Sequence, residues 1–366
     1  MRNPPFSPRV LPFLALALAG AGCAGPASLP TPRAATPAPA SADPLTRIED
    51  VRAEEYALSA DSMEGRFTGT PGMERAARYL AGRFRELGLR PAGDDGYYQH
   101  LPLAWDERGG HRVPRLLNAW ADTAGVAADR RGRGTNVAAI LPGADPALRG
   151  QVVLIDAHYD HLGTTTVGVC EAQGDDTVCN GADDDASGVV AVLEIARALS
   201  RGPAPRRTVV FLLTTGEEVG LLGTRWYVQH PVLPLDSMVA NLEIEMIGRP
   251  DSLAGGAGKA WLTGYSRSTM GQMLAAAAIP IVNDPRPDQN FFERSDNIAF
   301  ARRGIPAHTL STFNLHGDYH TANDEADRVD YAHMTDVIRA AVRAARLLAD
   351  GPAPRWNPGG QPQAGR

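Results

Sequence analysis

The stretch of residues 152–188 constrains the fold of this chain more than any other. It begins with an almost continuously apolar run, VVLID, followed by AHYDHLG and, after a segment flanked by cysteines, by NGADDDASG. Continuously apolar strands are typical of sheets buried on both faces. His158, Asp160 and three aspartates at 183–185 lie at the ends of apolar segments. These residue types are suited to form half of a metal site.

Apolar patterns of strand and helix type alternate along the rest of the chain. We expect strands at residues 97–103, 136–141, 151–156, 208–214, 238–247 and 306–310, and helices at 73–87, 188–199, 219–229, 266–278 and 331–348. This alternation, without internal repeats, predicts an α/β fold with three αβα layers and a mixed, largely parallel central sheet. Functional residues of such sheets gather beyond the carboxyl ends of the strands. The polar clusters AHYD, TTGEE and EMIG fall at these places.

Both ends of the chain differ in composition from its middle. Residues 1–23 have the layout of a signal peptide with a lipoprotein-type Cys23, and a plain secreted product cut near Ala21 is the alternative. Residues 24–45 read as an Ala/Pro-rich linker, 46–350 as one folded domain and 351–366 as a flexible tail. We therefore expect an exported lipoprotein that faces the periplasm or exterior and touches the membrane only through a lipid on Cys23.

The charge distribution and the cysteine content indicate which binding partners and which covalent links to expect. The net charge is −6 with both signs interspersed, so no nucleic-acid footprint is expected. Cys170 and Cys179 lie nine residues apart in a polar segment, where a disulfide within one loop is favoured for an exported protein. A metal held by these cysteines is the less favoured alternative.

Each candidate site residue also has a purely structural interpretation. His158 could ligate a metal through one ring nitrogen while Asp160 holds its orientation, or it could be a packed histidine at a strand end. The three aspartates could ligate a metal or cap a helix. Glu217 and Glu218 could divide metal binding and proton transfer between them or lie on the surface, and His320 could ligate a metal or be solvated.

Six motifs in this order and spacing carry a family resemblance. AHYD, GADDDASG, TTGEE, EMIG, RSD and DYHTAND resemble the co-catalytic di-zinc exopeptidases typified by bacterial secreted leucyl-type aminopeptidases. The upstream segment SMEGRFTGTPG is similar to the N-terminal part of that family, so the resemblance covers residues 48–348. Glutamate carboxypeptidase and glutaminyl cyclase are related to this family.

The resemblance implies two Zn²⁺ ions and peptide substrates with a free N-terminus. It also implies a role for each matching residue. Asp184 bridges the two ions, Glu218 and His320 complete one metal site, and His158 and Glu245 complete the other. Glu217 is the general base, and Asp160 orients His158.

The metal ligand in EMIG departs from the family pattern. Glu245 stands where the family commonly has an aspartate, and Glu243 lies two residues earlier on the same strand face. We prefer Glu245 because it directly precedes Met-Ile-Gly.

Two further departures concern the substrate. Asn297 stands where the family has a histidine after Ser-Asp, which leaves the oxyanion donor open, with Tyr319 and Arg294 as candidates. Residues 162–180 exceed a minimal connection and could shape the substrate entrance.

Three other activities stay open. A carboxypeptidase on the same scaffold would need a cationic pocket, for which Arg294, Arg302 and Arg303 are candidates. A glutaminyl cyclase is the second alternative. A binding lipoprotein without metals is the third, and it predicts gaps among the ligands that the sequence does not have.

Overall fold

The computed structural model describes residues 46–363, and a ten-stranded mixed sheet forms its centre. From one edge to the other the strands are β11 (Ile281–Asn283), β10 (Ala260–Leu262), β12 (Ala307–Ser311), β9 (Met238–Ile244), β5 (Val152–His158), β8 (Thr208–Thr214), β4 (Arg131–Leu141), β2 (Tyr98–Arg108) and β3 (His111–Leu116). The short β1 (Arg90–Pro91) pairs with β4, and β6 (Gly163–Thr164) and β7 (Val178–Cys179) form a separate two-stranded sheet.

The four central strands β12, β9, β5 and β8 run parallel, whereas β4, β2 and β3 pair antiparallel. His158 is paired with Thr214, and Asp156 with Glu243. The carboxyl ends of β5, β8 and β9 therefore meet at one edge of the sheet. This is the edge at which α/β proteins place their functional side chains.

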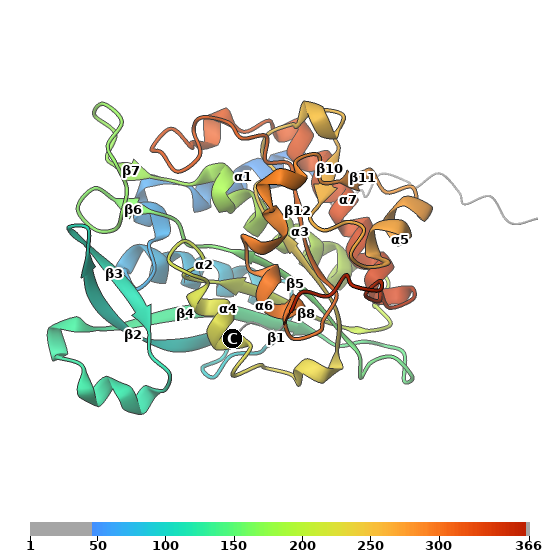
Figure 1. Cartoon of the computed structure of the whole chain (residues 1–366), viewed down its shortest axis with the longest axis horizontal. Coiled ribbons are helices and arrows are strands. Elements are labelled where there is room, and N and C mark those ends of the chain that lie inside the picture. The colour runs from blue at the N-terminus through green and yellow to red at the C-terminus, as the bar shows by residue number, and fades with distance from the viewer. Residues whose placement is uncertain (1–45, 364–366) are drawn as a thin grey trace, which may run out of the picture. The chain divides into compact units, whose positions relative to one another are not determined.

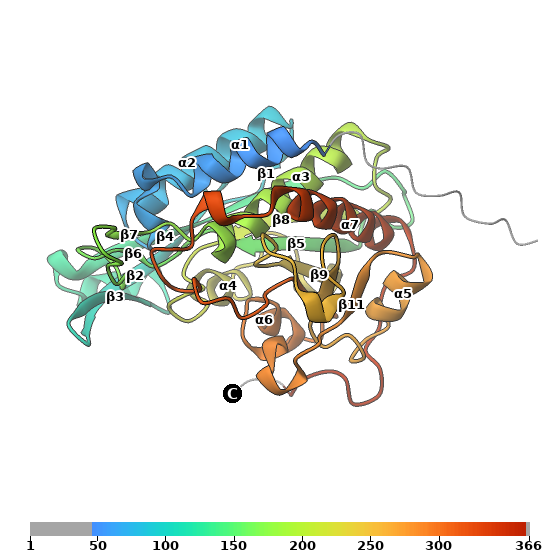
Figure 2. The same ribbon diagram turned by 90° about the horizontal axis from the view of Figure 1, so that it is seen from above.

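Helices cover both faces of the sheet (Figures 1 and 2). They are α1 (Ile48–Leu58), α2 (Pro71–Glu86), α3 (Ser187–Arg201), α4 (Leu222–Tyr227), α5 (Met270–Ala276), α6 (Asn297–Ala301) and α7 (Tyr331–Asp350). In Figure 2, α1, α2, α3 and α7 lie on one side of the central strands, and α4 and α6 on the other. All seven residues of β5 are buried, as expected for a strand covered on both faces.

The helix α2 shows how local sequence sets the elements that support the site. Thr70 caps its first turn by accepting a hydrogen bond from the Met73 amide, and Pro71 occupies the first position, where no amide is needed. Its apolar face includes Leu80 and Phe84, both fully buried in a core that also contains residues of the sheet and of α3. Burial of each such side chain contributes about 2 kcal/mol.

The three-layer αβα prediction with a mixed sheet is confirmed. The strand expected at 208–214 is β8, and the helix expected at 73–87 is α2 with slightly earlier ends. The strand expected at 97–103 continues to Arg108 and turns into β3, a hairpin that the apolar pattern does not predict.

The last described residues differ from the predicted flexible tail. Trp356 Nε1 donates to the Gly304 carbonyl at 2.9 Å, and Asn357 Nδ2 donates to the Ser266 carbonyl at 2.8 Å. This segment packs against the domain because the Trp356 side chain contacts an apolar cluster around α6. The predicted signal peptide, Cys23 and the linker 24–45 lie outside the described residues, and the division of the chain into these parts stays a prediction.

Candidate metal centre

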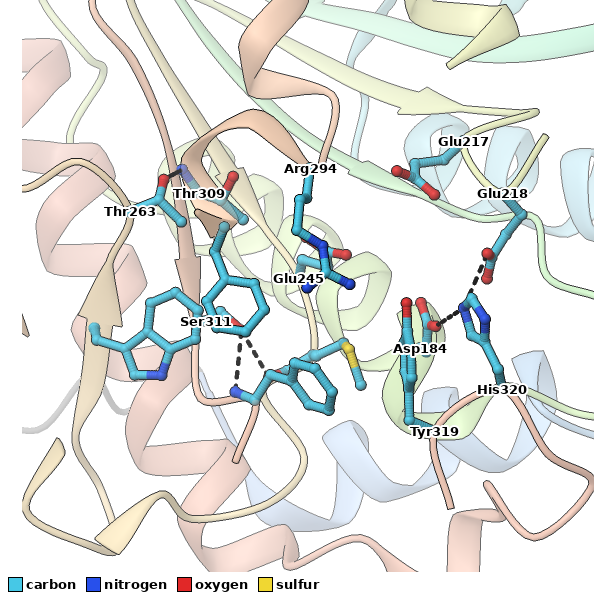
Figure 3. Close-up of a pocket in the computed structure, with 14 residues that line it drawn as sticks. Asp184, Glu217, Glu218, Glu245, Thr263, Arg294, Thr309, Ser311, Tyr319 and His320 are labelled. Carbon is cyan, nitrogen blue, oxygen red and sulfur yellow. Dashed lines mark hydrogen bonds and ion pairs between the residues drawn. The ribbon is translucent and has the colours of Figure 1, made fainter. Parts of the chain in front are cut away.

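The predicted site residues gather at the carboxyl edge of the parallel strands, and Figure 3 shows five of them, Asp184, Glu217, Glu218, Glu245 and His320. His158 is the last residue of β5, Glu217 and Glu218 follow β8, and Glu245 follows β9. The order of the strands therefore explains why residues far apart in sequence meet. His320 reaches the same place from the loop between β12 and α7.

Asp184 lies between two histidines. Its Oδ1 is 3.2 Å from Nε2 of His158, and its Oδ2 is 3.1 Å from Nε2 of His320. Asp324 fixes the turn from the other side, since its two carboxylate oxygens accept the amides of Asp183 and Asp184 at 3.1 and 2.9 Å. One buried carboxylate thus faces two separate groups of side chains.

The aspartates on either side of Asp184 shape its turn. Asp183 accepts the Gly248 amide at 2.6 Å, and Asp185 accepts the amides of Gly188 and Met246, each at 3.0 Å. Asp185 therefore caps the start of α3 and ties it to the end of β9. Sequence reasoning missed a further partner, His316, whose Nε2 lies 2.9 Å from Oδ2 of Asp183.

The first candidate ligand group contains His158, Asp184 and Glu245. Nε2 of His158 is 3.9 Å from Oε1 of Glu245, and its other ring nitrogen donates to the main-chain carbonyl of Asp160 at 3.2 Å. The Asp160 carboxylate also faces this nitrogen, with Oδ1 3.8 Å away, and the orienting role of its side chain stays a prediction. The same carboxylate accepts the Glu217 amide and the Thr68 hydroxyl, both at 3.1 Å.

The second candidate ligand group contains His161, Asp184 and Glu218. Nδ1 of His161 is 2.8 Å from Oε1 of Glu218, and Nε2 of His320 is 3.0 Å from Oε2 of the same carboxylate. Sequence reasoning missed His161. The signal was present in AHYDH, where a second histidine follows the first within one loop at a strand end.

The contacting atoms fit a metal ion better than they fit one another. Three buried atoms have no partner with hydrogen-bond geometry in residues 46–363, although a carboxylate or imidazole atom lies within 3.2 Å of each. They are His158 Nε2, His161 Nδ1 and Glu218 Oε1. Buried polar atoms rarely stay without partners. Imidazole and carboxylate ligands that converge in this way match the preferences of zinc.

Glu217 belongs to neither ligand group, and its carboxyl group lines the cavity beside them (Figure 3). Its restricted access to solvent raises its pKa well above the ordinary range, and the nearby carboxylates of Glu218 and Glu245 raise it further. A carboxyl group with a raised pKa next to a metal site is suited to accept and return a proton.

Glu243 has a different role from Glu245. It accepts hydrogen bonds from Ser295 Oγ at 2.5 Å, from Thr309 Oγ1 at 2.7 Å and from the amides of Asp296 and Asn297 at 3.0 and 2.9 Å. This carboxylate therefore holds the loop before α6, and Glu245 is the one that lies in a ligand group.

Asn297, at the position of the family histidine, is not among the residues that line the cavity. It is fully buried, and its side chain donates to the Phe292 carbonyl at 3.1 Å.

The cavity next to the two ligand groups encloses about 220 Å³. Its apolar side, here called the aromatic pocket, consists of Trp261, Phe291, Phe313 and Tyr319. Both candidate oxyanion donors line the cavity, namely Tyr319, whose pKa is raised by burial, and Arg294.

Other predicted contributors to the cavity lie elsewhere. Arg302 and Arg303 are exposed and do not line it, so Arg294 is the single arginine there. No residue of 162–180 lines it either, and the role of this segment at the substrate entrance stays a prediction. The Cys170–Cys179 disulfide closes the segment on itself, and Gly168 accepts a hydrogen bond from His111 in the β2–β3 hairpin.

Comparisons with known proteins agree with this geometry. Residues 136–345 match the family model of peptidase family M28. A vacuolar membrane protease of Lachancea thermotolerans is 26% identical over 220 residues, covering 59% of this chain and 20% of the relative. A vacuolar membrane protease of Aspergillus clavatus is 30% identical over 217 residues, covering 57% of this chain and 20% of the relative. The chain spans about a fifth of the length of these curated relatives.

Solved structures share the fold at low sequence identity. An aminopeptidase from Aneurinibacillus sp. has a TM-score of 0.59 and 17% identity, covering 86% of this chain and 96% of its own. A zinc aminopeptidase from Bacillus subtilis has a TM-score of 0.61 and 14% identity, and the match covers 83% of this chain and 96% of the aminopeptidase. Glutaminyl cyclase from Porphyromonas gingivalis has a TM-score of 0.57 and 16% identity, and the match covers 82% of this chain and 98% of the cyclase.

The comparisons overturn the predicted localisation. The curated relatives are named vacuolar membrane proteases and come from fungi, which contradicts an exported lipoprotein facing the periplasm or exterior. Between residues 46 and 363, no helix has the length and apolar content needed to cross a membrane.

Proposed function

Because this chain belongs to peptidase family M28, we propose that it is a zinc-dependent exopeptidase that removes N-terminal residues from peptides. The observation that carries this proposal is the position of Asp184, with one histidine within 3.2 Å of each carboxylate oxygen. A carboxylate held between two ligand groups is the arrangement that two neighbouring hydrolytic metal ions require.

In this proposal Asp184 would serve two zinc sites. His158 and Glu245 would complete one site, and Glu218 and His320 would complete the other, with His161 as an additional ligand there. Bound zinc would polarise the scissile carbonyl group and lower the pKa of a water molecule to near neutrality.

Glu217 performs the proton transfers in the proposed reaction. Its carboxylate accepts a proton from the attacking water and returns it to the amine that leaves the peptide bond. The Asp160 carboxylate holds the Glu217 main chain through the amide at 3.1 Å, so it positions the base. Tyr319 keeps its phenolic proton and lines the cavity, where it can donate to the oxygen that becomes negatively charged.

The proposed substrates are peptides with a free N-terminus. The α-amino group would lie against the carboxylates beside the metal sites, and the first side chain would enter the aromatic pocket. An N-acetyl group removes the positive charge and adds bulk at that point, so it should block cleavage.

A metal assay and a substrate panel test the proposal. Purified protein should contain about two zinc ions per chain and cleave aminoacyl-7-amido-4-methylcoumarins, but not their N-acetyl forms. Treatment with 1,10-phenanthroline should abolish cleavage, and added zinc should restore it. A zinc-loaded protein that cleaves neither these substrates nor free dipeptides would refute the proposal.

A carboxypeptidase on the same scaffold is the second candidate, and Arg294 is the observation that favours it. This arginine lines the cavity next to the ligand groups, where it could bind a terminal carboxylate. N-acetyl dipeptides with a free C-terminus separate the candidates, because only a carboxypeptidase should cleave them.

A further inference from the structure

The Cys170–Cys179 disulfide belongs to a small apolar cluster, here called the disulfide cluster. Its members come from the loop 162–180 and from the segment after His320, and all are buried: Leu162, Cys170, Cys179 and Ala322. Cys179 is fully buried, and Cys170 is 3% exposed. The bond therefore lies in the packed part of the domain, although residues 171–175, which it encloses, are exposed and the loop between β6 and β7 projects outward (Figure 1).

Three members of the disulfide cluster lie close in sequence to candidate ligands of the second group. The pairs of cluster member and ligand are Leu162 with His161, Cys179 with Asp184, and Ala322 with His320. Within each pair the two residues are at most five positions apart, so a shift in the cluster passes to the ligand through a short stretch of backbone. The disulfide therefore holds together three of the segments that supply this group, and Glu218, which follows β8, is supplied by a fourth.

The backbone just after Cys179 supports the ring of His161 directly. Gly181 has a φ of +57°, and a Cβ atom at this position would lie 2.4 Å from Cγ of His161. Such a distance leaves no room for a side chain, so the backbone of Gly181 packs against the imidazole. The Nδ1 atom of the same ring faces Oε1 of Glu218 at 2.8 Å. Because packed interiors transmit small displacements, a shift of residues 179–181 should move this ligand.

Two restraints hold residues 179–181 in place. The first is Arg66, which donates to the carbonyls of Asn180 and Gly181 at 2.6 and 2.9 Å. The second is the disulfide at Cys179, at the end of a two-stranded sheet (β6 and β7) that contains only two residue pairs. Two paired strands alone are marginally stable in water. Loss of the disulfide should therefore loosen this segment even though Arg66 stays in place.

The first ligand group is held by other parts of the fold. His158 ends β5 and Glu245 follows β9, and both strands lie in the middle of the large sheet. Pairing of His158 with Thr214 of β8 fixes its backbone. The two groups share Asp184, whose turn Asp324 fixes by accepting two main-chain amides. Loss of the disulfide should therefore affect the second group much more than the first.

We propose that the Cys170–Cys179 disulfide positions the second ligand group, so that reduction of this bond selectively weakens zinc binding there. This inference rests on the proposed function, because it requires two zinc sites. A phosphine reduces the bond by taking up the oxygen of a water molecule to become a phosphine oxide. The two hydrogens of that water end on the two cysteine sulfurs, which become thiols. The redox state of one bond would thereby set the occupancy of one metal site.

The test measures the affinity of both zinc ions with and without the bond. All proteins carry Cys23→Ser, so that the disulfide is the single source of thiols. Zinc-loaded protein is titrated with the chelator 4-(2-pyridylazo)resorcinol before and after treatment with tris(2-carboxyethyl)phosphine, and alkylation with mass spectrometry counts the thiols. After reduction one ion should bind about 10–100-fold more weakly, as when a group that supports a ligand is lost. The other ion should change by less than about threefold, and reoxidation should restore both affinities.

Variants separate the bond from the thiols that its reduction creates. Replacement of Cys170 and Cys179 together by alanine removes the bond without leaving a thiol that could bind zinc, and it should reproduce the loss. The absorbance of cobalt in the half-loaded protein should match that of half-loaded His161→Ala, because both retain the first site. The matched control Val167→Ser changes a 50% exposed residue of the same loop and should behave as wild type.

Each result decides the question. Unchanged affinity of both ions overturns the inference and leaves the proposed function intact. Equal weakening of both ions also overturns it, because the bond then stabilises the domain as a whole. A loss on reduction that the alanine variant does not reproduce overturns it as well, since the new thiols then remove the metal. If the alanine variant does not fold, the reduced wild type decides.

A failure of the proposed function is recognised separately, before any reduction. Oxidised protein that binds fewer than two zinc ions refutes the two metal sites and the inference with them. Oxidised protein that binds two zinc ions but cleaves no peptide refutes the proposed function alone, because the zinc affinities still test the role of the disulfide.

Discussion

Arg66 donates through Nε to the main-chain carbonyl of Tyr159 at 2.7 Å, directly after the candidate ligand His158. The same guanidinium donates to the carbonyls of Asn180 and Gly181 at 2.6 and 2.9 Å, which precede the turn that carries Asp184. Arg66 is fully buried. One side chain therefore fixes the spacing between two segments that each supply a candidate metal ligand.

Replacement of Arg66 by lysine should weaken both folding and metal binding. Lysine keeps the charge but lacks the planar fork, so it can satisfy only some of these carbonyls. We expect a loss of about 3 kcal/mol in unfolding free energy and about 10–100-fold weaker zinc binding. Denaturant unfolding and competition with a chelator measure the two effects.

The matched control for Arg66 is Arg75→Lys, which changes a partly exposed arginine whose Nε donates to the Ser62 carbonyl. This variant should stay close to wild type in both measurements. Wild-type zinc affinity in Arg66→Lys would show that the guanidinium does not position the ligands.

Replacement of Glu217 by glutamine should abolish turnover without removing metal. Glu217 is in neither ligand group, so zinc content should be unchanged. The amide cannot accept the proton, and general-base catalysis typically contributes 10²–10⁴-fold. Turnover of the preferred substrate and zinc content are measured on the same preparation, with Glu293→Gln at an exposed position as control. Near-normal activity in the zinc-loaded variant would exclude Glu217 as the base.

The sequence predicts the parts of this molecule that depend on local pattern. The run TVVFLLT gives β8 with correct ends because a run of only seven residues, rich in apolar and β-branched side chains, favours a strand buried between two helical layers. Glu217, Glu218 and Glu245 could be placed at one edge because the carboxyl ends of parallel strands meet there.

Long-range contacts explain what the sequence does not predict. His161 follows the predicted ligand His158 by three residues, yet only the fold shows that its Nδ1 turns toward Glu218, which follows β8. Arg66 ends the short 3-10 helix Asp61–Arg66, and its burial depends on carbonyl groups about 100 residues away. Such contacts leave no periodic signal in the sequence.

The stability of the protein should depend on pH through Glu325. Burial, together with nearby Asp176 and Asp61, raises the pKa of Glu325 to about 7, although its hydrogen bond from Asn180 acts in the opposite direction. The folded state therefore holds this proton more tightly than the unfolded state. The stability that the proton provides is fully present below about pH 4.5 and is lost as pH rises through about 7.

Glu325→Gln should match wild type at pH 4.5 and become the more stable protein by pH 8. Because the side chain is only partly buried, solvent screening limits the difference to about 1 kcal/mol. Thermal unfolding of both proteins across this range measures it, and the exposed Glu49→Gln serves as control. A difference in Tm that does not change with pH would contradict the assignment.

Replacement of His161 by alanine should weaken one metal site more than the other. His161 contacts Glu218, whereas His158 lies in the other ligand group, so the loss should be confined to the second site. We expect one zinc ion to bind at least 10–100-fold more weakly. Removal of a group that only hydrogen-bonds to a ligand already lowers metal affinity by about this factor, and removal of a ligand should lower it by at least as much. Stepwise zinc removal by a chelator, followed by the absorbance of cobalt-substituted protein, separates the two sites. The control His230→Ala changes a histidine that stacks on Trp226, outside both ligand groups, and should retain both ions. If His161→Ala releases both ions with wild-type affinities, His161 only packs beside Glu218 and the second site is completed by His320.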